Sequence, residues 1–284
     1  MILIADSGST KTEWGVILKS GAVSPERLFT RGLNPFFLSP EEIAREVTET
    51  LLTHLPSEPV EKVWFYGAGV RKEKEPVIRE ALRKVFDAEI FATSDMLGAA
   101  RALTGDKPGI VCILGTGANS CLYDGNNIVR NVPPLGYLLG DEGSGAWMGK
   151  HFLADLLKGL LPKEVEADFR TEYPDLTETE IIRRVYSEPA PNRFLASFAP
   201  FISERVYRHH QLLSLVTKGF SEFILRNVAL YPEARDLPVS FAGSVAYHLS
   251  DILEVCLGEE GFRVGRILKS PMDGLIEYHS QRNV

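Results

Sequence analysis

The residue types needed for binding phosphate occur together near the start of the chain, where residues 6–12 read Asp-Ser-Gly-Ser-Thr-Lys-Thr. Backbone N–H groups of a tight turn can converge on anionic oxygens. The hydroxyls of Ser9 and Thr10 and the ammonium of Lys11 can add to them. Gly8 allows the backbone to approach a ligand closely. This stretch is therefore a candidate phosphate-binding turn.

The carboxylate of Asp6 opens the same stretch and can hold Mg²⁺ through water. Apolar residues precede Asp6, and a second extended run follows from Glu13 to Leu18, so the pattern predicts a β-hairpin. It is not a Walker A loop, because that glycine and lysine spacing is absent and a strand follows. Taken alone, an ordinary hydroxyl-rich hairpin turn is an equally good interpretation.

A second turn of the same kind follows the apolar run Ile110 to Leu114. It contains Gly115, Thr116 and Gly117, and a returning strand is predicted over residues 120–123. Two hairpins with hydroxyl- and glycine-containing turns are much less probable by chance than one. They favour a nucleotide clamp, in which both turns bind one phosphate chain.

Two acidic positions stand close to these turns in the sequence. Asp95 follows a short predicted strand, Glu89 to Ala92, and either caps the next helix or faces a ligand cleft. Asp141 lies in the glycine-rich segment 134–150, which predicts a shaped loop that enters a helix near Ser144. An ordinary solvated surface loop is the alternative for this segment.

Length and composition bound the protein class. The 284 residues favour two domains or two similar halves. A net charge of −7 and a pI near 5.5 do not favour nucleic-acid binding. The three cysteines lack metal-ligand spacing and are expected to be buried thiols of a reducing compartment. No signal peptide or membrane span is recognised, so a cytoplasmic protein without membrane partners is expected.

The elements that would position these residues alternate between strand and helix. Ser39, Pro40 and Glu42 predict a capped helix start, and the helix would bury Ile43, Val47, Leu51 and Leu55. A strand over residues 62–66 then leads into a glycine turn that ends at Gly69, and a helix with Ile78, Leu82 and Val85 follows. This order predicts an α/β layer.

The second half predicts helices over residues 150–231, with Thr177 and Glu180 as a capping box. Aromatic and aliphatic residues recur there at helical spacing, at Phe194, Phe198, Phe201 and Val206. A strand before Gly243 and Ser244 then leads into a helix, where an adenosine can approach the backbone. A last strand over residues 262–268 and a helix from residue 271 complete the chain.

Three motifs in this order resemble the phosphate-1, phosphate-2 and adenosine motifs of the actin-like ATPase and sugar-kinase superfamily. They are residues 6–12, residues 115–117 and residues 241–244. Gly136 with residues 140–144, together with residues 115–120, resembles the N-acetylglucosamine kinase and BadF/BadG/BcrA/BcrD ATPase family. The resemblance implies an α/β fold of two ribonuclease-H-like (actin-like ATPase) domains with a nucleotide cleft between them. The domains would be 1–108 plus 271–284, and 109–270 with a helical insertion.

The same resemblance implies an ATP-dependent kinase that phosphorylates the 6-hydroxyl of an amino sugar with Mg²⁺. The sugar would be N-acetylglucosamine, glucosamine or N-acetylmuramic acid, and the protein a homodimer. Asp95 would be the general base and Asp6 the Mg²⁺ residue. The ATP phosphates and adenosine would contact Gly8, Ser9, Thr10, Lys11, Gly115, Thr116, Gly117, Gly243 and Ser244. The sugar would contact Asn34, Gly69, Asn119 and Asp141.

Some residues of this chain depart from the family pattern, and these departures bear on the alternative functions. The turn before Asn34 has a single glycine, Gly32, where the amino-sugar kinases carry a second. No cysteine pair suits the iron–sulfur cluster of the BadF-type activators, and no Cys/His motif matches the zinc site of the ROK kinases. Two rivals remain: an ATP-driven switch or activator without sugar kinase activity, and a non-catalytic sugar sensor. The acidic and basic residues named above favour the kinase.

Overall fold

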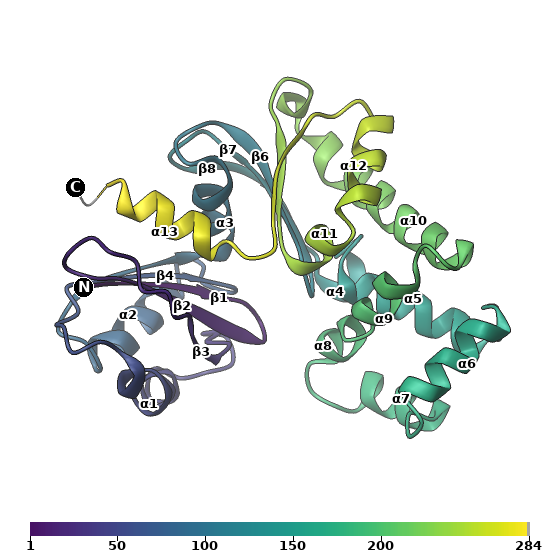
Figure 1. Ribbon diagram of the computed structural model, residues 1–284, viewed down its shortest axis with the longest axis horizontal. Coiled ribbons are helices and arrows are strands. Elements are labelled where there is room, and N and C mark those ends of the chain that lie inside the picture. The colour runs from purple at the N-terminus through teal and green to yellow at the C-terminus, as the bar shows by residue number, and fades with distance from the viewer. Residues whose placement is uncertain (283–284) are drawn as a thin grey trace. The chain divides into compact units, whose positions relative to one another are not determined.

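The computed structural model describes residues 1–282, drawn as a ribbon in Figure 1. The chain forms two compact units and contains two five-stranded sheets, one in unit 1 and one built mainly from unit 2. Unit 1 comprises residues 1–111, 123–129 and the segment from residue 270, and unit 2 comprises residues 112–122 and 130–269. Helices pack on both sheets, which confirms the predicted α/β fold class.

The sheet of unit 1 has the strand order β3-β2-β1-β4-β5. β2 pairs antiparallel with both β1 and β3, whereas β4 and β5 run parallel to β1. The carboxyl ends of β1, β4 and β5 therefore share one edge, where ligands of α/β proteins bind. The strands are β1 (Ile2–Ser7), β2 (Lys11–Ile17), β3 (Leu28–Arg31), β4 (Lys62–Gly67) and β5 (Glu89–Ser94).

Figure 1 shows α1 and α2 on one face of this sheet, and α3 and α13 on the other. The predicted start of α1 (Pro40–Thr50) is confirmed, because Ser39 and Glu42 form both hydrogen bonds of a capping box. Ile43, Val47 and Leu51 are buried as predicted, whereas Leu55 is half-buried beyond the short 3₁₀ helix η1 (Leu52–His54). α2 (Glu75–Arg83) buries Ile78 and Leu82, and Val85 follows its end.

Two glycines let α13 and the sheet approach α3 closely. The helices are α3 (Asp95–Thr104) and α13 (Met272–Ser280). A Cβ at Gly274 would lie 2.4 Å from the carbonyl oxygen of Ala102, and one at Gly98 would lie 2.8 Å from Tyr66. The Tyr66 hydroxyl is hydrogen-bonded to His279 Nε2 at 2.8 Å, which ties α13 to β4. The last helix is thus part of the unit 1 core.

The sheet of unit 2 has the order β10-β9-β6-β7-β8. The predicted second hairpin is present, since β6 and β7 are neighbours joined by residues 115–117. β9 and β10 pair in parallel. The strands are β6 (Gly109–Leu114), β7 (Ala118–Tyr123), β8 (Ile128–Val132), β9 (Val239–Ala242) and β10 (Val264–Leu268).

Helices make up most of the rest of unit 2. They are α4 (Gly136–Leu139), α5 (Gly145–Leu157), α6 (Lys163–Glu172), α7 (Glu178–Tyr186), α8 (Pro191–Ala196), α9 (Ala199–Arg205), α10 (His210–Arg226), α11 (Ser244–His248) and α12 (Ser250–Glu259). Two 3₁₀ turns, η2 (Val228–Leu230) and η3 (Pro232–Arg235), precede β9. No helix within residues 1–282 is both long enough and apolar enough to cross a membrane.

Two local predictions in unit 2 need correction. The glycine-rich segment is not loop throughout, because its residues 136–139 form α4. The predicted helices around Phe194 and Phe201 are present as α8 and α9, with Ser197 and Phe198 between them. Thr177 caps α7 through Glu180 N as predicted, but the Glu180 carboxylate accepts hydrogen bonds from Arg183 and Arg184. Those arginines satisfy the side chain that the capping box would have used.

The three cysteines are free and buried, all in unit 2. Burial raises the pKa of the Cys121 thiol to about 12 and raises those of Cys112 and Cys256.

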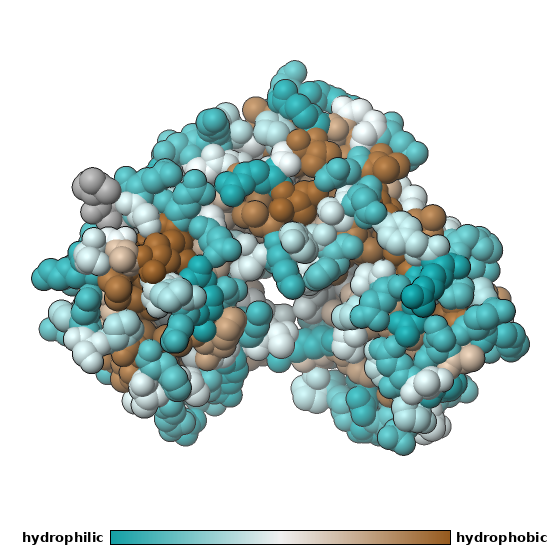
Figure 2. Space-filling view, viewed as in Figure 1, coloured by the Kyte–Doolittle hydropathy of each residue, from teal (hydrophilic) through white to brown (hydrophobic). Residues whose placement is uncertain are grey.

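Hydrophilic residues cover most of the face seen in Figure 2, as expected for a chain with 24% charged residues. The sites of chemistry must therefore be sought in particular turns and pockets.

Candidate active site

The predicted phosphate turn of unit 1 joins β1 to β2. Gly8 N donates to the carbonyl oxygen of Lys11 at 3.0 Å, which closes the turn. Gly8, Thr10 and Lys11 are exposed, and Ser9 is half-buried. The Lys11 ammonium lies 4.9 Å from the ring centroid of Phe29, a cation–π contact that restrains this long side chain. Exposed amides, hydroxyls and one ammonium are thus gathered in one turn.

Asp6 and Asp95 lie at the carboxyl ends of two parallel strands, β1 and β5, with β4 between them. The pKa of Asp6 is raised to about 7, first by burial and then by the negative charges of Asp95 and Glu13, while Lys11 opposes the shift. Burial raises the pKa of Asp95 to about 6, against the hydrogen bond from Met96 N. Both carboxyls therefore titrate near neutral pH, as groups in functional sites often do.

Ser94, and not Asp95, is the N-cap of α3. The Ser94 hydroxyl accepts a hydrogen bond from Leu97 N, and this removes the capping interpretation of Asp95. Asp95 Oδ1 accepts from Met96 N at 2.9 Å, and no donor to Oδ2 is found among residues 1–282. One carboxylate oxygen is therefore available to a ligand.

Asn34 and Gly69, both predicted to bind sugar, are brought into contact in unit 1. Gly69 has φ +78°, and a Cβ there would lie 2.6 Å from Asn34 Oδ1, so only glycine fits. Asn34 Oδ1 also accepts a hydrogen bond from Phe36 N at 2.9 Å. The side chain of Asn34 is thus held by its own turn and by the turn after β4.

In unit 2 the turn between β6 and β7 is fastened to the start of α5. Gly145 N donates to Gly115 O at 2.8 Å, and Ala146 N donates to Thr116 O at 3.0 Å. Gly243, with φ +126°, lies against β6, because a Cβ there would be 2.2 Å from the carbonyl oxygen of Leu114. The second and third predicted motifs therefore meet.

A pocket of about 410 Å³ opens where these elements meet, entirely within unit 2. Gly115, Thr116 and Ser244 of the predicted ATP-binding set line it, together with Gly145 at the start of α5. Gly117 and Gly243 of the same set do not line it; Gly117 O accepts a hydrogen bond from Gly115 N at 3.0 Å, and Gly243 packs against Leu114. The rest of the lining comes from α8, α9, α11 and their ends, namely Ala196, Ser197, Ala199, Pro200, Ser203, Glu204, Val245, His248 and Leu249.

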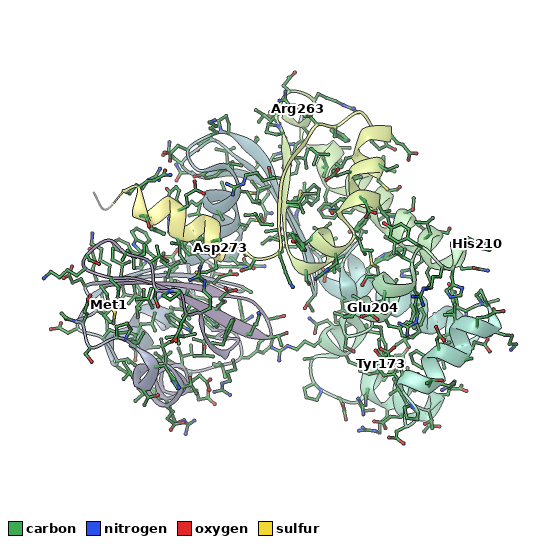
Figure 3. The ribbon with its side chains drawn as sticks, in the orientation of Figure 1. Met1, Tyr173, Glu204, His210, Arg263 and Asp273 are labelled. Carbon is green, nitrogen blue, oxygen red and sulfur yellow. The ribbon has the colours of Figure 1, made fainter. Side chains whose placement is uncertain are left out.

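The sequence did not identify the residues of α8 and α9, or those of α11 other than Ser244, that line this pocket. Glu204, labelled in Figure 3, belongs to α9, and His248 ends α11. Helical periodicity predicted the buried face of this region, through Phe198 and Phe201, but it does not say which exposed residues face a pocket. Which exposed residues face the pocket is determined by tertiary packing, such as that of α8 against α5.

Asp141 and Asn119 lie near the same hairpin of unit 2. Asp141 has φ +56°, and its Oδ1 accepts from Ala118 N at 3.1 Å. Burial raises its pKa, against the Ala118 hydrogen bond. Asn119 Oδ1 accepts from Ser120 N and from Asn131 Nδ2, both at 2.9 Å. The two predicted sugar residues of unit 2 thus flank Ala118.

Similarity to proteins of known structure provides evidence on the family of this chain that is independent of the site geometry. The chain is similar to the "putative N-acetylglucosamine kinase" of Porphyromonas gingivalis, with 46% identity, 100% of both chains covered and a TM-score of 0.93. A protein of the same description from Chromobacterium violaceum is 19% identical over 98% of each chain, with a TM-score of 0.70. A ROK family glucokinase from Streptomyces griseus, in complex with glucose and AMPPNP, is 15% identical over 99% of this chain and 100% of that one, with a TM-score of 0.61. The last two share the fold. No family model and no curated protein matches the chain.

Proposed function

Because this chain belongs to the N-acetylglucosamine kinase family of the actin-like ATPase and sugar-kinase superfamily, we propose that it phosphorylates the 6-hydroxyl of an amino sugar. The chain is an ATP-dependent sugar kinase. N-acetylglucosamine is the first substrate to test, with glucosamine and N-acetylmuramic acid as alternatives. The observation that carries the proposal is the pair of carboxyls at the ends of β1 and β5, one of which has a free oxygen.

Asp95 acts in this proposal as the general base. Phosphoryl transfer requires a hydroxyl in line with the phosphate, an acceptor for its proton and neutralised phosphate charge. A pKa of about 6 leaves Asp95 largely ionised at neutral pH yet basic enough to take a proton, which is the range in which general bases work best. Its Oδ2 would accept the proton of the sugar hydroxyl as the oxygen attacks the γ-phosphorus.

The phosphates are assigned to the two hairpin turns. Lys11, with the amides and hydroxyls of residues 8–10, supplies positive charge and donors in unit 1. Gly115, Thr116 and Gly117 supply the corresponding turn in unit 2. The 410 Å³ pocket is large enough for a nucleoside, with Gly243 and Ser244 beside the adenosine.

Asp6 is assigned to Mg²⁺ through water. Its pKa is raised first by burial and then by the negative charges of Asp95 and Glu13, and a bound cation would offset both effects. Within residues 1–282 no group of three or more His, Cys, Asp or Glu side chains could hold a metal ion alone, so the nucleotide phosphates would provide ligands too. Mg²⁺, when bound, neutralises phosphate charge.

The sugar hydroxyls and N-acetyl group are assigned to Asn34, Gly69, Asn119 and Asp141. Asn34 and Gly69 touch each other, and Asn119 and Asp141 flank one residue, so each pair forms a small polar surface. Amide and carboxylate groups held by backbone hydrogen bonds are well suited to hydroxyl recognition, because their orientation is fixed before the sugar binds.

The first experiment measures ADP release with ATP and Mg²⁺ against a panel of sugars. The panel contains N-acetylglucosamine, glucosamine, N-acetylmannosamine, N-acetylmuramic acid, glucose and a blank without sugar. Asp95→Asn should fold and bind ATP, because an amide oxygen can still accept from Met96 N, but kcat should fall about 10²- to 10⁴-fold.

Two outcomes would contradict the proposal. Near-normal turnover by Asp95→Asn would remove the general-base assignment. Slow ADP release that no sugar stimulates would instead favour an ATP-driven switch protein of the same fold. Mass spectrometry or NMR of the product would show whether the 6-hydroxyl carries the phosphate.

A further inference from the structure

Two buried hydroxyls connect the phosphate turn, residues 8–11, to the turn that carries Asn34, residues 31–34. Leu33 N donates to Ser7 Oγ at 3.0 Å. The hydroxyl oxygens of Ser7 and Thr12 are 2.8 Å apart, and Thr12 Oγ1 donates to the carbonyl oxygen of Arg31 at 3.0 Å. The Ser7 hydroxyl on β1 and the Thr12 hydroxyl on β2 thus link the backbone of Leu33 to the backbone of Arg31.

The Thr12 hydroxyl is the donor in both of its contacts, toward Ser7 Oγ and toward Arg31 O. A hydroxyl has one proton, so these two acceptors share it, while Ser7 Oγ also accepts from Leu33 N. Ser7, Thr12 and Leu33 are at most 1% exposed, so water cannot replace a lost partner. Removing the Ser7 hydroxyl would leave the buried Leu33 N–H without this partner, which is costly. Removing the Thr12 hydroxyl would break the link between Ser7 and Arg31, although Ser7 Oγ keeps Leu33 N and Arg31 O keeps the Thr30 hydroxyl.

The backbones of the two turns are also in direct contact. Gly32 N donates to Thr10 O at 2.9 Å. A Cβ at Gly32 would lie 2.7 Å from the carbonyl oxygens of both Gly8 and Ser9, so a larger residue would push the turns apart. A displacement of the phosphate turn is therefore transmitted to the residues just before Asn34.

We infer that Ser7 and Thr12 are positioning residues for the sugar, which act through Asn34 without touching the ligand. The inference rests on the proposed function, because that function assigns Asn34 to the sugar. The hydrogen bond to Leu33 N fixes the main chain one residue before Asn34. The amide of Asn34 is held in turn by Phe36 N and Gly69, so its direction follows from the path of that main chain.

The test uses a pair of substitutions that differ in the hydroxyl alone or in the methyl alone. Thr12→Val keeps the shape and loses the hydroxyl, whereas Thr12→Ser keeps the hydroxyl and loses the methyl. Thr12→Val should raise the KM for the sugar about 3- to 10-fold, the effect of losing one buried hydrogen bond whose acceptors keep other donors. Thr12→Ser should stay within about twofold of the wild type, and Ser7→Ala should behave like Thr12→Val. The KM for ATP should change less than about twofold.

Ser240→Ala is the matched control. Ser240 is a buried serine of β9 whose Oγ accepts a hydrogen bond from Arg266 N. Its loss should lower the unfolding temperature as the loss of Ser7 does, but the KM for the sugar should not change. A general effect of destabilisation is thereby separated from positioning.

Three results would overturn the inference while leaving the kinase intact. They are an unchanged sugar KM in Thr12→Val, equal damage from Thr12→Ser and Thr12→Val, and an equal rise in the KM for ATP. In the last case the hydroxyls would set the phosphate turn instead. If the wild type shows no sugar-dependent turnover, the proposed function fails, and the two failures are distinguishable.

Discussion

At the scale of single residues, unit 1 places three carboxyls near one another, with the Lys11 ammonium beside Asp6 and the Arg27 guanidinium beside Glu13. Asp6 faces Glu13 across the β1–β2 ladder, and both Glu13 and Asp95 raise the pKa of Asp6. Lys11 opposes them. A protein that needed only stability would place apolar or neutral residues here, because buried charges of one sign are costly. This arrangement therefore suits the binding of a cation.

Asp6 should make the free protein less stable as pH rises. Its pKa is about 7 in the folded chain and near 3.8 otherwise, so the folded state binds more protons between these values. Stability from this group is present below pH 4 and is lost as pH rises toward 7. Asp6→Asn removes that loss. The difference in unfolding temperature, variant minus wild type, should grow from pH 5 to pH 8 in the absence of nucleotide.

Asp124→Asn is the control for this measurement. The N–H groups of Asn127 and Asn126 lower the pKa of the Asp124 carboxyl, so it is ionised throughout the range tested. Its substitution should change the unfolding temperature by a similar amount at pH 5 and pH 8. A difference for Asp6→Asn that is equally independent of pH would contradict the charge argument.

At the scale of elements, the pocket of unit 2 to which we assign the nucleotide depends on how closely α8 packs against α5. Gly145 and Gly149 form the contact face of α5. A Cβ at Gly149 would lie 1.9 Å from the carbonyl oxygen of Leu195, and one at Gly145 would lie 3.2 Å from the Cβ of Ala196. Ala196 itself lines the pocket. The glycines of α5 therefore set the position of a pocket wall.

Gly149→Ala should force α8 away from α5. Overpacking of this kind typically costs about 1–3 kcal/mol of unfolding free energy. ATP binding should weaken as well, since Ala196 moves with α8. Urea unfolding and nucleotide titration measure the two effects.

The control is Gly258→Ala in α12, where nothing lies within 4 Å of the added Cβ. It should leave ATP binding unchanged and stabilise the chain by about 0.5–1 kcal/mol, the usual gain of alanine over glycine in a helix. Unaltered stability and nucleotide binding in Gly149→Ala would show that α8 adjusts without cost.

At the scale of the whole molecule, the residues assigned to each ligand are divided between the two units. Asn34 and Gly69 belong to unit 1, whereas Asn119 and Asp141 belong to unit 2. The phosphate residues are divided in the same way. The domain boundaries expected from the sequence, at residues 108 and 270, and the homodimer stay predictions.

Patterns within about ten residues were predictable from the sequence. The capping box at Ser39 and both hairpin turns depend on neighbouring residues alone, and they are present. That Ser94 rather than Asp95 caps α3 was not predicted, although serine is a strong N-cap residue. The hydrogen bonds of Ser7 and Thr12, and the position of Glu204 in the lining of the unit 2 pocket, were not predictable. Both depend on tertiary packing between segments far apart in the sequence.

The distribution of cysteines has a practical consequence for following motions of this protein. All three thiols lie in unit 2, and each is buried with a raised pKa, so little reactive thiolate reaches solvent. Alkylation therefore requires unit 2 to open, and its rate reports that opening while unit 1 is silent. ATP bound in the 410 Å³ pocket should slow iodoacetamide labelling of the native protein without any engineered probe. Rapid labelling at a rate that ATP does not change would show that smaller fluctuations are enough to expose these thiols to the reagent.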